Sequence, residues 1–134
     1  MKVTEFMTTR IESIDAERTV YDAIERMVDL RIRSLLVIFP GDDKNDGVIT
    51  ARDVVFRVLA QGKDPRAIRI ADIASRPIMC IDKDTTLDKA ESLMESNGIA
   101  RVFICDREAI IGVLSLLDVM AGVLILRARG EHGA

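Results

Sequence analysis

The chain has 134 residues, enough for one compact domain or two very small ones. Apolar residues make up 49% and aromatic residues only 4%, so the chain can bury a sizeable core that aliphatic side chains must fill. Its 19 basic and 22 acidic residues give a net charge of −3, and the absence of a Lys/Arg block makes nucleic acid an unlikely partner.

The first predicted helix begins after an extended segment, residues 10–15. Thr19 is expected to cap it and Asp22 lies three places on, which is the spacing of a capping box. The helix should run to about Leu30, because one apolar face recurs at helical spacing: Val20, Ala23, Ile24, Met27 and Val28.

Two strands and a second helix are expected next. Residues 34–39 are aliphatic and β-branched, which predicts a strand, and the polar residues 40–46 predict a loop. A returning strand should start at Gly47. A helix follows from Thr50 to about Ala60, with these residues on its buried side: Val54, Val55, Val58 and Leu59.

The same pattern then repeats. A shift of 67 residues pairs Ile11 with Ile78 and Thr19 with Thr86, and after a loop that is two residues shorter the shift is 65. The sequence therefore predicts a tandem repeat of about 60 residues. We expect a first motif at residues 1–62, a linker at 63–69, a second motif at 70–128 and a polar tail at 129–134.

Each half reads as extended segment, helix, strand, strand and helix, so the predicted class is α+β with two βαββα units. One unit alone buries too little surface to be stable. We expect the two units to pack sheet to sheet around a pseudo-twofold axis. The last helix, from about Leu116 to Arg129, is either a core helix or a dimer-forming face, because many of its residues are apolar: Leu117, Met120, Val123, Leu124 and Leu126.

One string occurs in both halves, as G-V-I-T-A-R-D-V at Gly47–Val54 and as G-V-L-S-L-L-D-V at Gly112–Val119. Its hydroxyl residue and the carboxylate three places later have the spacing of a helix capping box. An open helix N-terminus with these two groups is also a place to hold a ribose and its phosphate. Duplication favours the second interpretation.

The sequence offers little material for catalysis or metal binding. The only histidine is His132, in the polar tail, so a nucleophile–histidine pair or a histidine-based metal site cannot be assembled. We expect Cys80 and Cys105 to be reduced core residues rather than a disulfide or metal ligands. No signal peptide or long apolar span is present, which predicts a soluble, cytoplasmic protein without catalytic or metal residues.

The chain resembles a tandem pair of CBS (cystathionine β-synthase) domains, a Bateman module, from Val3 to about Leu126. Besides the duplicated string, the matching text is V-T-E-F-M-T at Val3–Thr8, I-D-A-E-R-T-V-Y-D-A at Ile14–Ala23, I-D-K-D-T-T-L-D-K-A at Ile81–Ala90 and G-I-A-R-V-F-I-C at Gly98–Cys105. The resemblance implies a regulatory pocket between the motifs for AMP, ADP, ATP or S-adenosylmethionine, with no required cofactor. It also implies a homodimer that signals to an unidentified regulated protein.

The resemblance assigns roles to nine residues, and position alone adds Arg33 and Arg52, although all three arginines can also be solvated surface residues. The aspartates bind the ribose hydroxyls, and the hydroxyl residues contact ribose or phosphate: Asp53, Asp118, Thr50 and Ser115. Four aliphatic residues pack on adenine: Ile32, Ile99, Val48 and Val113. Three arginines can reach phosphate: Arg101, Arg33 and Arg52. The chain departs from the family at Leu36 and Phe103, where a proline is usual, and at Arg31, where a glycine is usual.

Two other functions compete with this one. The chain can be an interaction or oligomerisation module without a ligand, in which the Thr/Ser-x-x-Asp strings only cap helices. The arginines distinguish the two, because a helix cap does not need them. An enzyme acting on nucleotides is disfavoured, since no acid, base and nucleophile can be placed together.

Overall fold

The computed structural model describes residues 1–41 and 46–130, which form two compact units. Unit 1 combines Met1–Ile11 with the chain from Met79 onward, and unit 2 is Glu12–Ile78. The expected loop at residues 40–46 lies partly outside the described residues, as do His132 and most of the expected polar tail.

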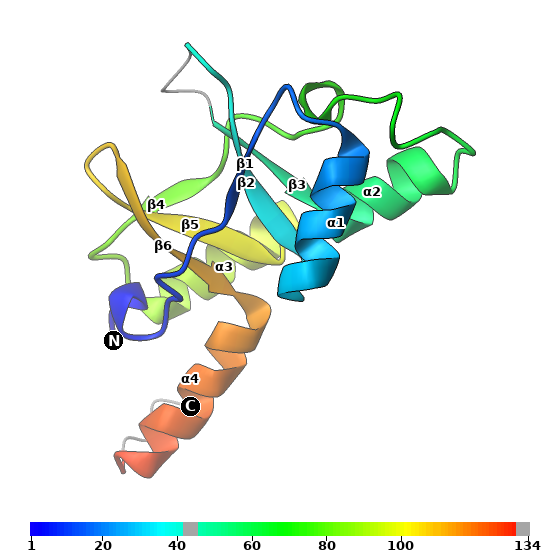
Figure 1. The fold of residues 1–134 in the computed structure, drawn as a ribbon. Helices are drawn as coiled ribbons and strands as arrows, with labels where there is room; N and C mark the ends of the chain where they lie inside the picture. The colour runs from blue at the N-terminus through cyan, green and yellow to red at the C-terminus, as the bar shows by residue number, and fades with distance from the viewer. Residues whose placement is uncertain (42–45, 131–134) are drawn as a thin grey trace. The chain divides into compact units, whose positions relative to one another are not determined.

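Unit 2 contains a three-stranded sheet and two helices (Figure 1). Strand β1 (Ser13–Asp15) pairs in parallel with β2 (Ser34–Ile38), which pairs antiparallel with β3 (Gly47–Thr50). Helix α1 (Val20–Leu30) joins β1 to β2. Helix α2 (Ala51–Val54) continues as a π-helical turn, η2 (Val55–Leu59), and a 3₁₀ turn, η3 (Ile70–Asp72), follows.

Unit 1 repeats this order after a short 3₁₀ turn, η1 (Val3–Glu5). Strand β4 (Cys80–Asp82) pairs in parallel with β5 (Arg101–Asp106), which pairs antiparallel with β6 (Ala109–Ser115). Helix α3 (Leu87–Asn97) joins β4 to β5, and α4 (Leu116–Ala128) follows β6. Both units are therefore βαββα, and the predicted α+β class is confirmed.

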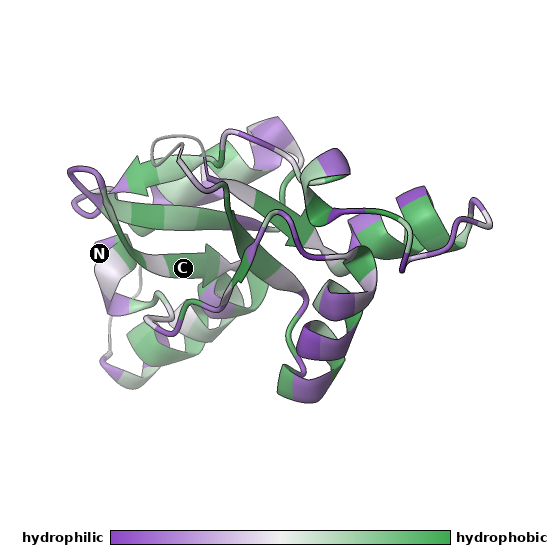
Figure 2. Cartoon of the chain, turned by 45° about the horizontal axis from the view of Figure 1, so that its top comes forward, coloured by the Kyte–Doolittle hydropathy of each residue, from purple (hydrophilic) through white to green (hydrophobic). Residues whose placement is uncertain are grey.

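Each unit has its own aliphatic core, and the strands are mainly hydrophobic while the helices alternate (Figure 2). The side chains with no exposed surface are, in unit 2, Ala16, Val20, Ala23, Val37, Ile49, Val58 and Ile70, and in unit 1, Val3, Ala90, Val102, Ile104 and Leu114. This confirms most of the apolar face predicted for α1, where Val20, Ala23 and Met27 are buried, although Val28 is 67% exposed.

The boundaries of the two units do not coincide with the boundaries of the two repeats. The segment that precedes each repeat packs on the other repeat. The N-terminal segment, residues 1–8, lies beside α3 in unit 1 (Figure 1), where Leu87 donates its backbone N–H to the Met1 carbonyl at 2.8 Å. The linker segment, residues 64–78, lies in unit 2, where Val20 donates to the Ile68 carbonyl at 2.9 Å and Ile70 to the Arg18 carbonyl at 2.8 Å.

The glycine that opens each duplicated string is required by these exchanged segments. A Cβ atom on Gly47 would lie 2.7 Å from the Ser75 carbonyl oxygen, and one on Gly112 would collide with the Met7 side chain. Only a residue without a side chain lets the exchanged backbone approach the strand this closely.

The cysteine prediction is wrong. Cys80 is exposed and Cys105 is half-buried, so neither belongs to the core, and the two form a disulfide with a Cα–Cα distance of 5.9 Å. Parallel pairing places Asp82 opposite Cys105, which brings Cys80 diagonally across from it on the same face of the sheet. Alternating side chains then point Ile81 into the core and both sulfurs away from it.

The core-helix interpretation of α4 is also wrong, since most of its apolar side chains are exposed. Leu117 is 69%, Met120 61% and Leu124 68% exposed, whereas Leu126 is buried. The helix contacts unit 1 through a narrow side at Gly122, against the side chains of Phe6 and Leu87. A narrow contact leaves the rest of the helix surface uncovered. The second helix likewise buries only one side, at Val54 and Val58, whereas Val55 and Leu59, which were also expected on its buried side, are exposed.

The backbone is strained at Arg31, the position where the family usually has a glycine. Arg31 follows α1 with φ 55°, and Gly98 follows α3 with φ 59°, so both helices end in a left-handed residue. A side chain in this region costs about 1–2 kcal/mol, which glycine avoids.

We expect Arg31→Gly to raise the free energy of unfolding by about 0.5–1 kcal/mol, because the relief of the left-handed strain exceeds the extra chain entropy of an unfolded glycine. The reverse change, Gly98→Arg, should lower it. Urea unfolding of both variants and the wild type measures the two effects. No gain in the Arg31 variant would show that its backbone is unstrained.

Candidate functional site

The duplicated strings form the same hydrogen-bonded structure in both units. In unit 2, Thr50 donates its backbone N–H (3.0 Å) and its hydroxyl (2.9 Å) to Oδ2 of Asp53, whose own N–H donates to the Thr50 hydroxyl at 3.1 Å. In unit 1 the corresponding distances between Ser115 and Asp118 are 2.8, 3.0 and 3.2 Å. The predicted capping boxes are therefore present at the starts of α2 and α4.

The cap uses one carboxylate oxygen of each aspartate, Oδ2, and makes no bond to the other, Oδ1. Within the described residues, all the hydrogen bonds to Asp53 side-chain oxygens go to Oδ2. Oδ1 of Asp118 accepts only a long bond of 3.5 Å, from the Thr8 hydroxyl. Both aspartates are half-buried. A carboxylate oxygen that is uncommitted and accessible can accept hydrogen bonds from a neutral polar ligand such as a diol.

The exchanged segments add a hydroxyl residue that sequence reasoning missed in each unit. Thr8 and Val113 exchange backbone hydrogen bonds of 2.8 and 2.9 Å, and Ser75 and Val48 exchange two of 2.9 Å. Thr8 and Ser75 are themselves 67 residues apart, so the repeat contained the signal. It was missed because the pairing partners lie far away in the sequence.

The four predicted adenine-packing residues lie near these helix starts. Val48 and Val113 are half-buried in β3 and β6, two positions before the capping hydroxyl. Ile32 and Ile99 are also half-buried and lie just before β2 and β5. The first residues of β2 and β5 pair with the capping residues, Ser34 with Thr50 and Arg101 with Ser115. Aliphatic side chains that keep part of their surface accessible suit the face of a base.

The three predicted phosphate-binding arginines have different surroundings. Arg101 is half-buried and lies opposite Ser115, beside the α4 N-terminus. Arg52 is exposed and its guanidinium stacks 5.1 Å from the Phe56 ring centroid. Arg33 is exposed, and its carbonyl accepts the Ala51 N–H at 2.9 Å. Arg101 is thus the best placed for an anion at a helix N-terminus.

A groove of about 340 Å³ in unit 1 adjoins the predicted site. It is lined by apolar residues, with two carboxylates of α3 among them: Glu91, Met94, Glu95, Gly98, Ile99, Ala100, Leu116 and Val119. It includes Ile99 and opens beside the first turn of α4, but none of the capping residues lines it.

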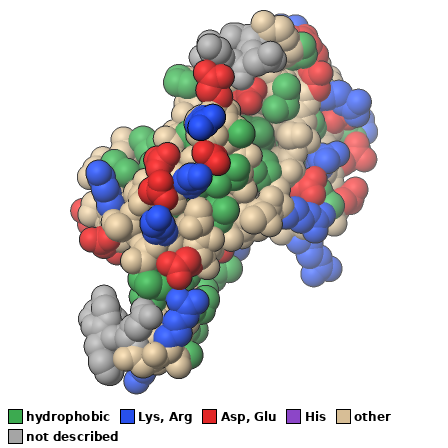
Figure 3. Space-filling view, turned by 90° about the vertical axis from the view of Figure 1, so that its left-hand side faces the viewer, with side chains coloured by type: hydrophobic (Ala, Val, Ile, Leu, Met, Phe, Trp, Pro, Cys, Tyr) green, Lys and Arg blue, Asp and Glu red, His purple; other side chains and the backbone are tan. Residues whose placement is uncertain are grey.

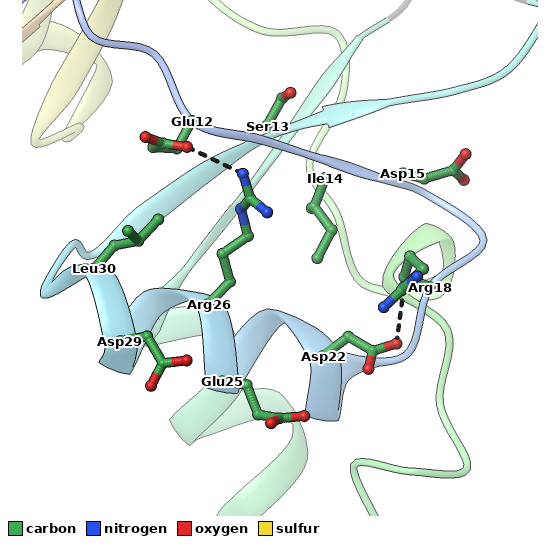
Figure 4. A pocket seen from close by; sticks show the side chains of 10 residues that line it. All are labelled: Glu12, Ser13, Ile14, Asp15, Arg18, Asp22, Glu25, Arg26, Asp29 and Leu30. Carbon is green, nitrogen blue, oxygen red and sulfur yellow. Dashed lines mark hydrogen bonds and ion pairs between the residues drawn. The ribbon is translucent and has the colours of Figure 1, made fainter.

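A larger groove of about 600 Å³ lies between β1 and α1 of unit 2 (Figure 4). It contains none of the predicted site residues. Its two arginines form ion pairs, Arg26 with Glu12 at 3.0 Å and Arg18 with Asp22 at 3.1 Å. The remaining acidic side chains, Asp15, Glu25 and Asp29, make the groove negative, which disfavours a phosphate.

A third capping box offers a comparison outside the site. Thr19 and Asp22 exchange the same backbone and hydroxyl hydrogen bonds at the start of α1. Donation from the Thr19 backbone N–H, assisted by Arg18, lowers the pKa of Asp22. The exchanged linker segment also pairs with this box, Thr19 with Arg69, but it brings an arginine instead of a hydroxyl residue such as Thr8 or Ser75. This cap therefore has an exchanged segment beside it but lacks the hydroxyl neighbour of the site.

On the face in Figure 3, acidic and basic side chains lie beside one another, so this face does not form a basic nucleic-acid surface. Among residues 1–41 and 46–130, no group of three or more His, Cys, Asp or Glu side chains is arranged to hold a metal ion. The helices in the same ranges are too short or too polar to cross a membrane.

Comparison with curated proteins finds relatives, several of which are described as CBS domain-containing proteins. An uncharacterised protein of Methanopyrus kandleri is 35% identical over 86 residues, which are 63% of this chain and 44% of that protein. A mitochondrial CBS domain-containing protein of Arabidopsis thaliana is 28% identical over 109 residues, 79% of this chain and 53% of its own. The chain thus spans about half the length of these two relatives.

Solved structures share the fold. A putative signal-transduction protein with CBS domains from Burkholderia ambifaria superposes with a TM-score of 0.84 at 25% identity, covering 93% of this chain and 95% of that one. A hexameric CBS-CP12 protein from bloom-forming cyanobacteria gives 0.86 at 24% identity, covering 95% and 74%.

The family model for the CBS domain matches twice, at residues 3–60 and 70–124. These segments contain both capping boxes and both glycines that admit the exchanged segments. The chain therefore belongs to the CBS-domain family, as a tandem pair of the kind that serves as a regulatory module.

Proposed function

We propose that the protein is a non-catalytic sensor that binds an adenosine-containing ligand and signals to a partner protein. The observation that supports this most is that the cap uses only Oδ2 of the aspartate in both units. Among the described residues, Oδ1 accepts no bond in Asp53 and only the long bond from Thr8 in Asp118. In the proposed complex Oδ1 accepts from the ribose diol, the half-buried aliphatic residues contact adenine, and Arg101 faces phosphate. AMP, ADP, ATP and S-adenosylmethionine share this nucleoside.

Signalling requires that the ligand prefer one of two conformations. The capping aspartates lie in the first turns of α2 and α4, and the hydroxyl residues that pair beside them belong to the exchanged segments. A ligand that binds both elements stabilises the arrangement in which they lie together. A partner that recognises α2, α4 or an exchanged segment would therefore respond to the ligand.

Thermal unfolding with AMP, ADP, ATP, adenosine, GTP and S-adenosylmethionine tests the proposal. Ligand at about 100 times its dissociation constant should add about 2.7 kcal/mol. For a domain of this size that raises the melting temperature by several degrees. We expect a shift with at least one adenine ligand and none with GTP. A folded protein that responds to none of them would contradict the sensor function.

Substitution of the aspartates separates ligand binding from helix capping. Asp53→Ala and Asp118→Ala should each cost about 1 kcal/mol of stability as a lost cap and should also weaken nucleotide binding at one site. Asp22→Ala is the matched control, because it removes the third capping box and should cost similar stability without changing affinity. Urea unfolding measures the loss of stability, and titration calorimetry measures the affinity. Unchanged affinity in both site variants would exclude the ribose role.

We also propose that α4 mediates self-association. Exposed large apolar side chains run along it: Leu116, Leu117, Met120, Val123, Leu124 and Ile125. A contiguous apolar helix face of this kind is more typical of an interface than of a free surface. A second copy supplies the same face, as expected for a closed homodimer. The oligomer of the cyanobacterial relative is compatible with association in this family.

Leu117→Glu should therefore shift the protein to a smaller species in light scattering after gel filtration, because it places a charge in the proposed interface. Val28→Glu is the control. Val28 is an apolar residue on α1 that is 67% exposed, close to the 69% of Leu117. The same loss of mass in both variants, or in neither, would exclude an interface specific to α4.

A further inference from the structure

The disulfide lies where the chain re-enters unit 1. Cys80 is the first residue of β4, and it is bonded to Cys105 in β5. Strand β4 is a three-residue edge strand, so few hydrogen bonds hold it to the sheet. Cys80 is exposed, which gives a reductant access to its sulfur. Exposed disulfides are more often labile or regulatory than buried ones.

The turn that follows β4 is attached to β5, the strand that contains Cys105. Lys83 donates its backbone N–H to the Cys105 carbonyl at 3.0 Å, and its ammonium group pairs with Asp106 at 3.3 Å. Thr85 closes the turn by donating to the Asp82 carbonyl at 3.0 Å. The position of residues 82–86 therefore depends on how firmly β4 is held against β5.

The N-terminal segment, residues 1–8, is docked on this turn. Val3 donates its N–H to the Thr85 carbonyl at 2.9 Å, and the Lys2 ammonium pairs with Asp84 at 2.9 Å. The segment then ends at the candidate site, where Thr8 pairs with Val113 and its hydroxyl lies 3.5 Å from Oδ1 of Asp118. Continuous contacts thus run from the disulfide to the site within unit 1.

We propose that the Cys80–Cys105 disulfide is a reversible redox switch that controls the docking of the N-terminal segment and, through it, ligand affinity at the Asp118 site. The disulfide holds β4 and its turn in place, so the segment is docked and Thr8 stays at the site. Reduction leaves β4 held by its few hydrogen bonds alone, and the segment docks less firmly. The affinity part of this inference rests on the proposed nucleotide binding.

The switch needs a dithiol reductant and a disulfide oxidant. One thiolate of the reductant attacks Sγ of Cys80, forms a mixed disulfide and releases Cys105 as a thiolate. The second thiol of the reductant then displaces Cys80 and leaves as a cyclic disulfide, and the two cysteines end as thiols. Two electrons and two protons pass from reductant to protein. Glutathione disulfide reverses the reaction by accepting the same two electrons.

Amide hydrogen exchange tests the switch without any ligand. The oxidised protein and the same protein reduced with dithiothreitol are compared at the Val3, Thr8 and Val113 amides, which donate the docking bonds. Protection there should fall by about tenfold on reduction. Val48 and Ser75 form the equivalent pair in unit 2 and serve as the internal control. Because the chain has only 2 cysteines, any effect of the reductant on the protein belongs to this pair.

Ligand binding is then measured by calorimetry with AMP, ATP and S-adenosylmethionine on both forms. We expect about tenfold weaker affinity at one site after reduction. The double variant Cys80→Ser, Cys105→Ser should behave as the reduced form whether or not dithiothreitol is present. Alkylation with a maleimide should label both thiols in the reduced protein and neither after treatment with glutathione disulfide.

Different failures have different meanings. Equal protection in both forms, equal loss at the unit 2 control pair, or thiols that never pair with glutathione disulfide would each overturn the switch. An affinity change without a change at Thr8 would overturn the route through the N-terminal segment. Lower protection at Thr8 with no binding of any adenine ligand in either form would support the switch and overturn the nucleotide function.

Discussion

The structure depends on two short backbone pairings between distant parts of the chain, Thr8 with Val113 and Ser75 with Val48. Each attaches the segment preceding one repeat to a strand of the other repeat, so both units contain chain from two regions of the sequence. A three-stranded sheet with two helices buries little surface, and the added segment contributes buried residues such as Val3 and Ile70. The exchange therefore joins the stability of each unit to the integrity of both repeats.

The same pairings explain how a helix cap can also serve a ligand. The capping box satisfies the first turn of the helix through Oδ2 alone, and the exchanged segment brings a hydroxyl residue to the neighbouring strand. At the Thr19–Asp22 box the exchanged segment brings Arg69 in place of a hydroxyl residue. Capping and ribose binding are thus compatible uses of one carboxylate, and the neighbouring groups distinguish the two cases.

The sequence predicted what depends on local spacing and on the repeat itself. Helical periodicity located α1, and the Thr/Ser-x-x-Asp spacing located the caps of α2 and α4 to the residue. It missed features that depend on contacts between distant residues: the exchanged segments, the register that brings Cys80 to Cys105, and the narrow contact that exposes α4. Periodicity identifies an apolar face, but another part of the chain or a second chain decides whether that face is covered.

The two units have similar backbones but different side chains. The disulfide and the arginine opposite the capping hydroxyl both occur in unit 1. Positions 80 and 105 correspond, 67 residues earlier, to Ser13 and Ile38, so only unit 1 has the disulfide. Unit 1 also has Arg101 opposite its capping hydroxyl, where unit 2 has Ser34. The groove beside β1 in unit 2 is negative and repels phosphate. In the proposed function a charged nucleotide should therefore prefer unit 1, which is the unit whose N-terminal segment the proposed redox switch controls.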